Sequence, residues 1–262
     1  MSTRTHTLTD TATMLRRNLR HTLRYPAMTV GSVFGPVIML LLFVGILGKT
    51  LGAGLAATGG HHTGGYIGYI APGIIITAVA SGSMATAVAV CVDMTEGIVD
   101  RFRTMPIARV SILAAHVINS MITTVVSTAS VIAVAMALGF RPSAGLADWA
   151  AAAGLLLLLT FALTWLAVAI GLVSETPEAA SNSPMLIVFL PFIGSAFAPA
   201  GSMPPVVRQF AEYQPFTPAI ETIRGLLTGT PTGHNPVIAI AWCVVIATGG
   251  YLWARAGFNR AR

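Results

Sequence analysis

Long apolar runs recur along the 262-residue chain, and charged residues gather in the short stretches between them. Six runs lack Asp, Glu, Lys and Arg altogether, and a helix needs about 20 such residues to cross the hydrocarbon core of a bilayer. We therefore expect six transmembrane helices, at about 27–48, 66–92, 110–139, 149–173, 183–200 and 235–254. The runs are too long for the alternating strands of a membrane barrel. The predicted fold class is an all-α polytopic membrane protein.

The residues before the first run carry a helical pattern of their own. An apolar stripe recurs at helical spacing beside a basic face: the stripe is Leu8, Ala12, Leu15, Leu19 and Leu23, and the basic face is Arg16, Arg17, Arg20 and Arg24. Such an amphipathic helix is typical of a segment that lies in the membrane interface, where anionic lipid attracts it. We predict a cytoplasmic interfacial helix over residues 1–24, with a solvated leader as the alternative. Pro26 separates it from the first span.

The fifth apolar run is irregular. Prolines at positions 184, 191 and 199 interrupt it, so only residues 185–199 can form one helix, which is short for a full crossing. Two short amphipathic segments follow, 205–213 and 217–227. Each carries an oppositely charged pair at helical spacing, Arg208 with Glu212 and Glu221 with Arg224. We predict a re-entrant or interfacial hairpin on the outer side over residues 204–228, before the last span.

Composition agrees with a lipid environment. Apolar residues make up 55% of the chain and charged residues 9%, whereas a soluble domain carries roughly 25% charged residues. With a mean hydropathy of +0.77, the chain is not a water-soluble enzyme, a secreted disulfide scaffold or a disordered tail. The net charge of +6 does not indicate nucleic acid, because no basic patch has aromatic or motif support. Cys91 and Cys243 lie inside apolar runs, which predicts neither a disulfide framework nor a zinc site.

The basic residues orient the chain. If both termini are cytoplasmic, 11 of the 15 Lys and Arg residues fall on cytoplasmic segments and 4 on outer ones, as the positive-inside rule requires. We predict a multi-pass protein of the bacterial plasma membrane with both termini in the cytoplasm and a cytoplasmic tail over 255–262. A cleaved signal peptide is the alternative for the first run, but the 24 residues before it are long for a signal sequence.

Motifs for catalysis are not found. Gly48-Lys49-Thr50 looks like the end of a phosphate-binding loop, but that loop needs a glycine where this chain has Phe43. We therefore expect no enzyme and no cofactor on this chain, with any ATP and Mg bound by a partner subunit. The six histidines lack the spacing of metal ligands, so no metal site is predicted.

A polar stripe runs along the third predicted span. Its members fall on one side of a helix: His116, Asn119, Ser120, Thr123 and Ser127, with Ser130 further on. The stripe could line a solvated pathway, or it could pack against other helices through hydroxyl hydrogen bonds. We favour packing.

The densest group of charges lies between the second and third spans. Residues 93–109 hold six charged side chains, with Ile98, Phe102 and Met105 as a small apolar face. A helix is predicted over 94–106, ended by Pro106. A charged amphipathic helix of this kind suits docking into a cleft on a partner. A plain solvated loop is the alternative.

This segment resembles the cytoplasmic loop of ABC-2 type transporter permeases, through Glu96-Gly97, Arg101, Pro106 and Arg109. The similarity is greatest to the daunorubicin/doxorubicin-resistance branch of drug exporters. It continues through residues 189–192, 195–199, 203–204, 210–218 and 224–227 and covers nearly the whole chain. It identifies residues 25–254 as an ABC-2 type transmembrane domain.

The resemblance implies a permease subunit of an ATP-binding cassette exporter, assembled as a homodimer. A separate cytoplasmic ATPase would drive it through the segment 94–106, called the coupling helix, and through the leader. The residues implied in that contact are Glu96, Gly97, Asp100, Arg101, Phe102, Arg103, Pro106 and Arg109. The implied substrate is a hydrophobic drug or antibiotic taken from membrane lipid. A lipid or lipid-linked glycan is the alternative cargo, and a non-transporting membrane scaffold is the alternative function.

Overall fold

The computed structural model describes residues 26–57, 65–95 and 109–260, and all regular structure in these ranges is helical. This confirms the all-α prediction for the described residues. In order, the chain forms α2 (Pro26–Gly45), α3 (Gly48–Ala57), α4 (Tyr66–Thr95), α6 (Arg109–Ala137), α7 (Leu146–Val173), α8 (Pro177–Asn182), α9 (Met185–Ile193), a 3-10 turn (Ala200–Ser202), α10 (Pro205–Tyr213), α11 (Phe216–Thr228) and α12 (Asn235–Arg260). The interfacial helix predicted over 1–24 and most of the coupling helix lie outside the described residues.

Four helices in the described residues are long and apolar enough to cross a membrane: α4, α6, α7 and α12. They agree with the second, third, fourth and sixth predicted spans to within a few residues, apart from a longer end on α12. The first predicted span is α2, which continues into α3 after a bend of 57°, and this bent pair would make a fifth crossing if it counts as one span. Six crossings therefore stay a prediction.

The fifth predicted span, 183–200, does not form one long helix. A short helix, α8, precedes it, and there the Thr176 hydroxyl accepts a hydrogen bond from the amide of Ala179 at 3.2 Å. After Pro184 the chain starts again as α9, which ends at Ile193 rather than continuing to 199. Gly194, the residue after the helix, has an extended backbone (φ −91°, ψ −163°) and lies against Gln214 and Thr217 with no room for a side chain. The helix predicted over 185–199 is therefore too long.

Helix α4 is the centre of the bundle. The most apolar stretch of α4 is 78% buried inside the protein, whereas the corresponding stretch of α12 is 22% buried. Helix α4 packs against α2, α6, α7, α8, α9 and α11. Small residues allow this, because helices in membranes associate through close backbone approach. Gly171 of α7 lies directly against the Ala87 carbonyl of α4, and Gly73 of α4 lies against Ala196, with no room for a side chain at either glycine.

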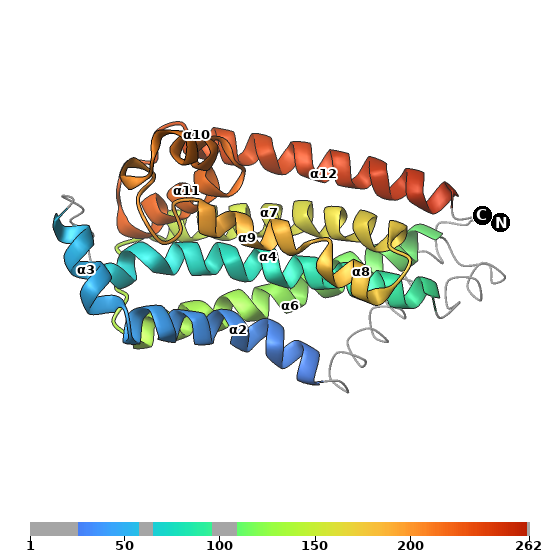
Figure 1. The fold of residues 1–262 in the computed structure, drawn as a ribbon, viewed down its shortest axis with the longest axis horizontal. Helices are drawn as coiled ribbons and strands as arrows, with labels where there is room; N and C mark the ends of the chain where they lie inside the picture. Colours follow the sequence, from blue (N-terminus) through green and yellow to red (C-terminus); the bar gives the residue numbers. More distant parts are fainter. Residues whose placement is uncertain (1–25, 58–64, 96–108, 261–262) are drawn as a thin grey trace.

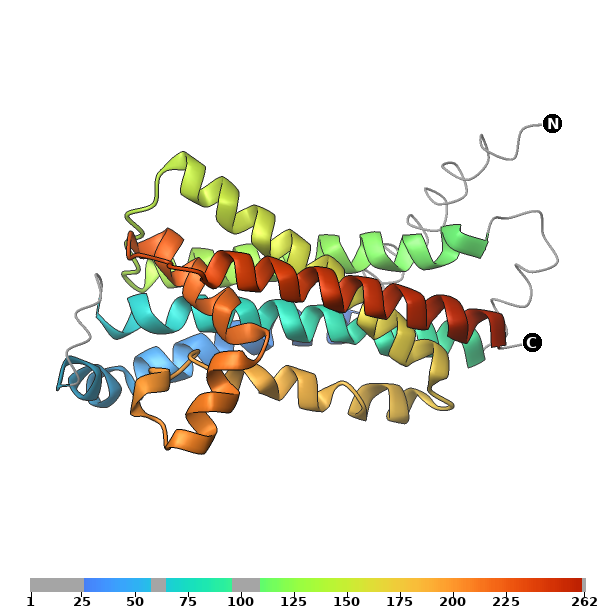
Figure 2. The ribbon, with the colours of Figure 1, turned by 90° about the horizontal axis from the view of Figure 1, so that it is seen from above.

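The long helices alternate in direction. Figures 1 and 2 show α2, α6 and the α8–α9 segment running one way, and α4, α7 and α12 running the other. One end of the bundle, which we call the hairpin end, carries α3, α10 and α11. At the opposite end, which we call the terminal end, α12 ends and α4 approaches the start of α6, and α2 begins in the same half of the bundle. This alternation brings segments far apart in the sequence together at each end.

The contact between α7 and α12 yields a test of close packing. A side chain at Gly250 would lie 2.7 Å from the backbone nitrogen of Leu166, whereas one at the neighbouring Gly249 would meet nothing within 4 Å. We expect Gly250→Ala to lower the thermal unfolding midpoint by about 5 °C, because overpacking typically costs about 1–3 kcal/mol. Gly249→Ala should leave it unchanged or slightly higher, since alanine is the better helix former.

The measurement is thermal unfolding of the purified protein in detergent, followed with a thiol-reactive dye. Cys91 and Cys243 are free and buried, so they react only as the bundle opens. Equal midpoints for the two variants would show that this helix contact does not limit stability.

Candidate functional site

Most of the predicted ATPase contact lies outside the described residues. This applies to Glu96, Gly97, Asp100, Arg101, Phe102, Arg103 and Pro106, and to the leader arginines Arg16, Arg17, Arg20 and Arg24. Arg109 is the first residue of α6, but its side chain is also outside the described part. The role of these residues stays a prediction, and the structure describes instead the two helices that flank the coupling segment.

A buried polar pair joins those two helices at the terminal end. Nε2 of His116, on α6, lies 3.1 Å from Oδ2 of Asp93, on α4, and the two side chains are 7% and 14% exposed. Nearby, the Cys91 thiol donates to the carbonyl oxygen of Ser174 at 3.4 Å, which ties α4 to the end of α7. Spacing along the sequence does not pair Asp93 with His116, because the two residues are 23 positions apart and belong to different predicted segments.

The polar stripe of α6 turns mainly toward its neighbours. His116, Ser120 and Ser127 are buried, while Asn119 and Thr123 are half-buried. The Ser120 and Thr164 hydroxyls lie 3.2 Å apart between α6 and α7, and Thr123 donates to the carbonyl of Asn119 in its own helix. Two of the five members, His116 and Ser120, thus make polar contacts between helices, and Ser127 is buried. No cluster of three or more metal-ligating side chains occurs in the part of the chain that the structure describes.

The most extensive polar network of the hairpin end centres on Arg224 of α11, which is 3% exposed. Its Nη1 donates to Glu221 Oε1 at 2.6 Å and its Nη2 to the carbonyl oxygen of Ser195 at 2.7 Å. Nε and Nη2 also donate to the carbonyl oxygen of Tyr69, at 3.3 and 3.2 Å. The guanidinium carbon lies 3.8 Å from the centre of the Tyr69 ring. One side chain therefore connects α11, α4 and the segment after α9.

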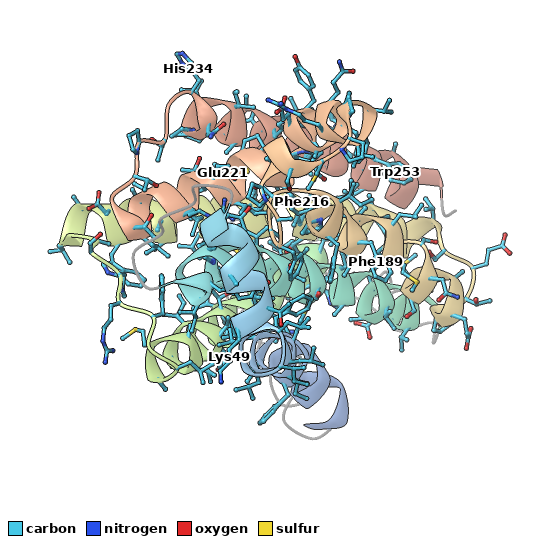
Figure 3. All side chains as sticks on the ribbon, turned by 60° about the vertical axis from the view of Figure 1, so that its left-hand side comes forward. Lys49, Phe189, Phe216, Glu221, His234 and Trp253 are labelled. Carbon is cyan, nitrogen blue, oxygen red and sulfur yellow. The ribbon has the colours of Figure 1, made fainter. Side chains whose placement is uncertain are left out.

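This network compensates a charge that would be costly to bury alone. Glu221 supplies the opposite charge, two carbonyl groups accept the remaining hydrogen bonds, and the aromatic ring of Tyr69 adds a cation–π contact. The Tyr69 hydroxyl also donates to the Ser195 carbonyl, at 3.0 Å. Figure 3 looks onto this end and shows Glu221 and Phe216 of α11 near its centre. Sequence spacing found the pair Glu221–Arg224 but not the burial of the arginine.

Aromatic side chains and unsatisfied polar atoms lie around the same end. The Phe197 ring is 4.7 Å from the Phe43 ring and 4.8 Å from the Phe192 ring, between centroids. Within the described residues, the Ser195 hydroxyl and the Gln214 side-chain oxygen are buried without a hydrogen-bond partner. The hairpin end thus combines a cluster of packed aromatic rings with buried polar groups whose hydrogen bonding is incomplete.

Comparison with known proteins agrees with this architecture. The model of the ABC-2 type transporter family matches residues 9–228. The chain is 27% identical to a daunorubicin resistance ABC transporter permease of Streptomyces coeruleorubidus over 221 residues, which are 84% of this chain and 75% of the relative. It is 26% identical over 220 residues, 82% of this chain and 79% of the relative, to a protein of Mycobacterium tuberculosis named "Probable doxorubicin resistance ABC transporter permease".

The family match spans most of the chain and includes α2 to α11. Together with the long apolar helices, it confirms the resemblance that the residues of the sequence indicated. The chain is a multi-pass membrane protein that belongs to the ABC-2 type transporter family.

Proposed function

We propose that this chain is the permease subunit of an ATP-driven exporter of hydrophobic drugs or antibiotics in the bacterial plasma membrane. The observation that carries the proposal is the family match over residues 9–228, together with relatives whose names assign them to daunorubicin and doxorubicin resistance. The apolar helices supply the membrane-embedded body that such a permease needs.

ATP hydrolysis is assigned to a separate cytoplasmic subunit. Gly48, Lys49 and Thr50 start helix α3 directly after another helix, whereas a phosphate-binding loop follows a strand. The partner ATPase would hold ATP and Mg and would engage the coupling helix over 94–106. A second permease subunit, most simply another copy of this chain, completes the transporter.

The terminal end is the cytoplasmic end in this proposal. The end of α12 lies there, and so do the two helix ends that flank the coupling segment, while α2 begins in the same half of the bundle. The alternating directions of the long segments support six passes, with the α8–α9 segment as the fifth. The hairpin of α10 and α11 then lies on the outer side.

The pair Asp93–His116 gives the coupling segment a firm connection to the bundle. A displacement of residues 96–108 acts on the ends of α4 and α6, and the 3.1 Å contact between these side chains makes the two ends move together. The Cys91–Ser174 hydrogen bond extends the connection to α7. Movement of one cytoplasmic segment can therefore reach three helices.

The coupling assignment is tested with the double substitution Arg101→Ala and Phe102→Ala. Buried aromatic and Arg side chains tend to dominate the energy of an interface. We therefore expect the permease with its ATPase partner to lose drug-stimulated ATPase activity and export, while membrane insertion stays intact. The matched control is Arg255→Ala, which removes an exposed arginine near the end of α12 and should leave both activities unchanged. Full export by the double variant would refute the assignment.

A second test addresses the connection between α4 and α6. His116→Leu removes the contact of Nε2 with Asp93, which joins α6 to α4. One lost hydrogen bond shifts the equilibrium between joined and separated helix ends about fivefold. We therefore expect the number of drug molecules exported per ATP hydrolysed to fall by up to about that factor. The control is His234→Leu, because His234 is exposed at the hairpin end. The connection has no role in coupling if the two variants export drug with equal efficiency in reconstituted vesicles.

A further inference from the structure

The segment formed by α9 and the residues after it is held to the bundle differently from its neighbours. Pro191 is the one buried residue of α9, and Leu186 is 80% exposed. Helix α11 is the opposite case, because 11 of its 13 residues are buried. At the hairpin end, α11 and α4 therefore form the fixed part of the core, and α9 lies on its outside.

Two residues after α9 anchor this outer segment to α4 and α11. Ser195 and Ala196 are both fully buried, and Ala196 packs against Gly73 of α4. The carbonyl oxygen of Ser195 accepts two hydrogen bonds, from Arg224 Nη2 at 2.7 Å and from the Tyr69 hydroxyl at 3.0 Å. Because α9 has ended at Ile193, this carbonyl takes its partners from α4 and α11.

We propose that the Ser195 carbonyl is a releasable latch: its two hydrogen bonds hold the α9 segment against α4 and α11, and their release opens the hairpin end of the bundle. Arg224 and Tyr69 are positioning residues in this proposal. The proposal deepens the proposed function and rests on it, since an exporter must open on its outer side.

The arrangement of hydrogen bonds allows the α9 segment to separate while the rest of the network stays intact. When the Ser195 carbonyl leaves, Arg224 keeps its charge partner Glu221, which lies on the same helix, and keeps the Tyr69 carbonyl and ring. No charge is left unpaired in the core, which would otherwise be the largest cost. The separation therefore breaks two hydrogen bonds, the Ala196–Gly73 contact and apolar packing such as that of Phe197 on Phe43, but leaves the pairing of α4 with α11 intact.

Polar atoms around the latch also favour a second arrangement. The Ser195 hydroxyl and the Gln214 side-chain oxygen are buried and have no hydrogen-bond partner within the described residues. Buried polar groups are satisfied in most structures, so these atoms gain partners when the segment moves into contact with water. The cost of burying these unsatisfied atoms offsets part of the free energy by which the latch stabilises the closed arrangement.

The experiment compares two conservative variants of the full chain in lipid nanodiscs. Tyr69→Phe keeps the ring under Arg224 but removes the hydroxyl that donates to Ser195. Tyr66→Phe, one turn earlier on α4, removes a buried hydroxyl that has no partner among the described residues. Amide hydrogen exchange is then measured by mass spectrometry for residues 194–199 and, as an internal reference, for 216–228.

We expect Tyr69→Phe to accelerate exchange in 194–199 about fivefold, the factor by which one neutral hydrogen bond shifts an opening equilibrium. Exchange in 216–228 should not change, and Tyr66→Phe should leave both segments as in the unsubstituted protein. Equal exchange in the two variants would overturn the latch. Faster exchange of both segments in Tyr69→Phe would also overturn the latch, because a residue that only stabilises the whole fold would give that result.

A second variant keeps the test open if Tyr69→Phe does not fold. Arg224→Lys retains the charge, but an ammonium group cannot reproduce the planar fork that reaches Glu221 and both carbonyls. We expect about tenfold faster exchange in 194–199, and an unchanged rate there would count against the proposal. These measurements need no ATPase, so a negative result would contradict only the latch proposal. A negative result in the coupling test would instead contradict the proposed exporter function.

Discussion

Close contact between helix backbones around α4 is the constraint on which the bundle depends. Helices in lipid gain nothing from burying apolar side chains against each other rather than against lipid tails, so packing at short range has to hold them together. Gly171 against Ala87, Gly73 against Ala196 and Gly82 against Thr124 are the places where no side chain fits. Because these contacts lie on several sides of α4, this helix sets the positions of α6, α7 and the segment after α9.

The polar network at the hairpin end follows from that arrangement. Prolines and Gly194 prevent the fifth apolar run from forming one continuous helix, which leaves the carbonyl of Ser195 without a helical partner. Irregular backbone at membrane depth is tolerated only where protein satisfies its polar groups. Arg224 does so for Ser195 and Tyr69 at once, and Glu221 balances its charge. A buried arginine here completes the backbone hydrogen bonding of an interrupted apolar run.

Helix α4 also connects the two ends of the molecule. Tyr69 lies near its start in the Arg224 network, and Asp93 lies near its end in the contact with His116. Its 30 residues extend about 45 Å at the usual rise of 1.5 Å per residue. A packed helix of this length moves largely as one body, so a displacement at the coupling segment can reach the contacts that hold the α9 segment. This is a physical route between the proposed cytoplasmic drive and the proposed outer closure.

Spacing along the chain is enough to predict the long apolar helices, the two short amphipathic ones and the pairs Arg208–Glu212 and Glu221–Arg224, because these depend on positions within one helix. The end of α9, the burial of Arg224 and the contact of Asp93 with His116 follow only from the packing of the folded chain. Those features depend on residues brought together from distant parts of the chain, such as Gln214 and Thr217 against Gly194. Periodicity reports which face of a helix is apolar, but it carries no information about which other helix will cover that face.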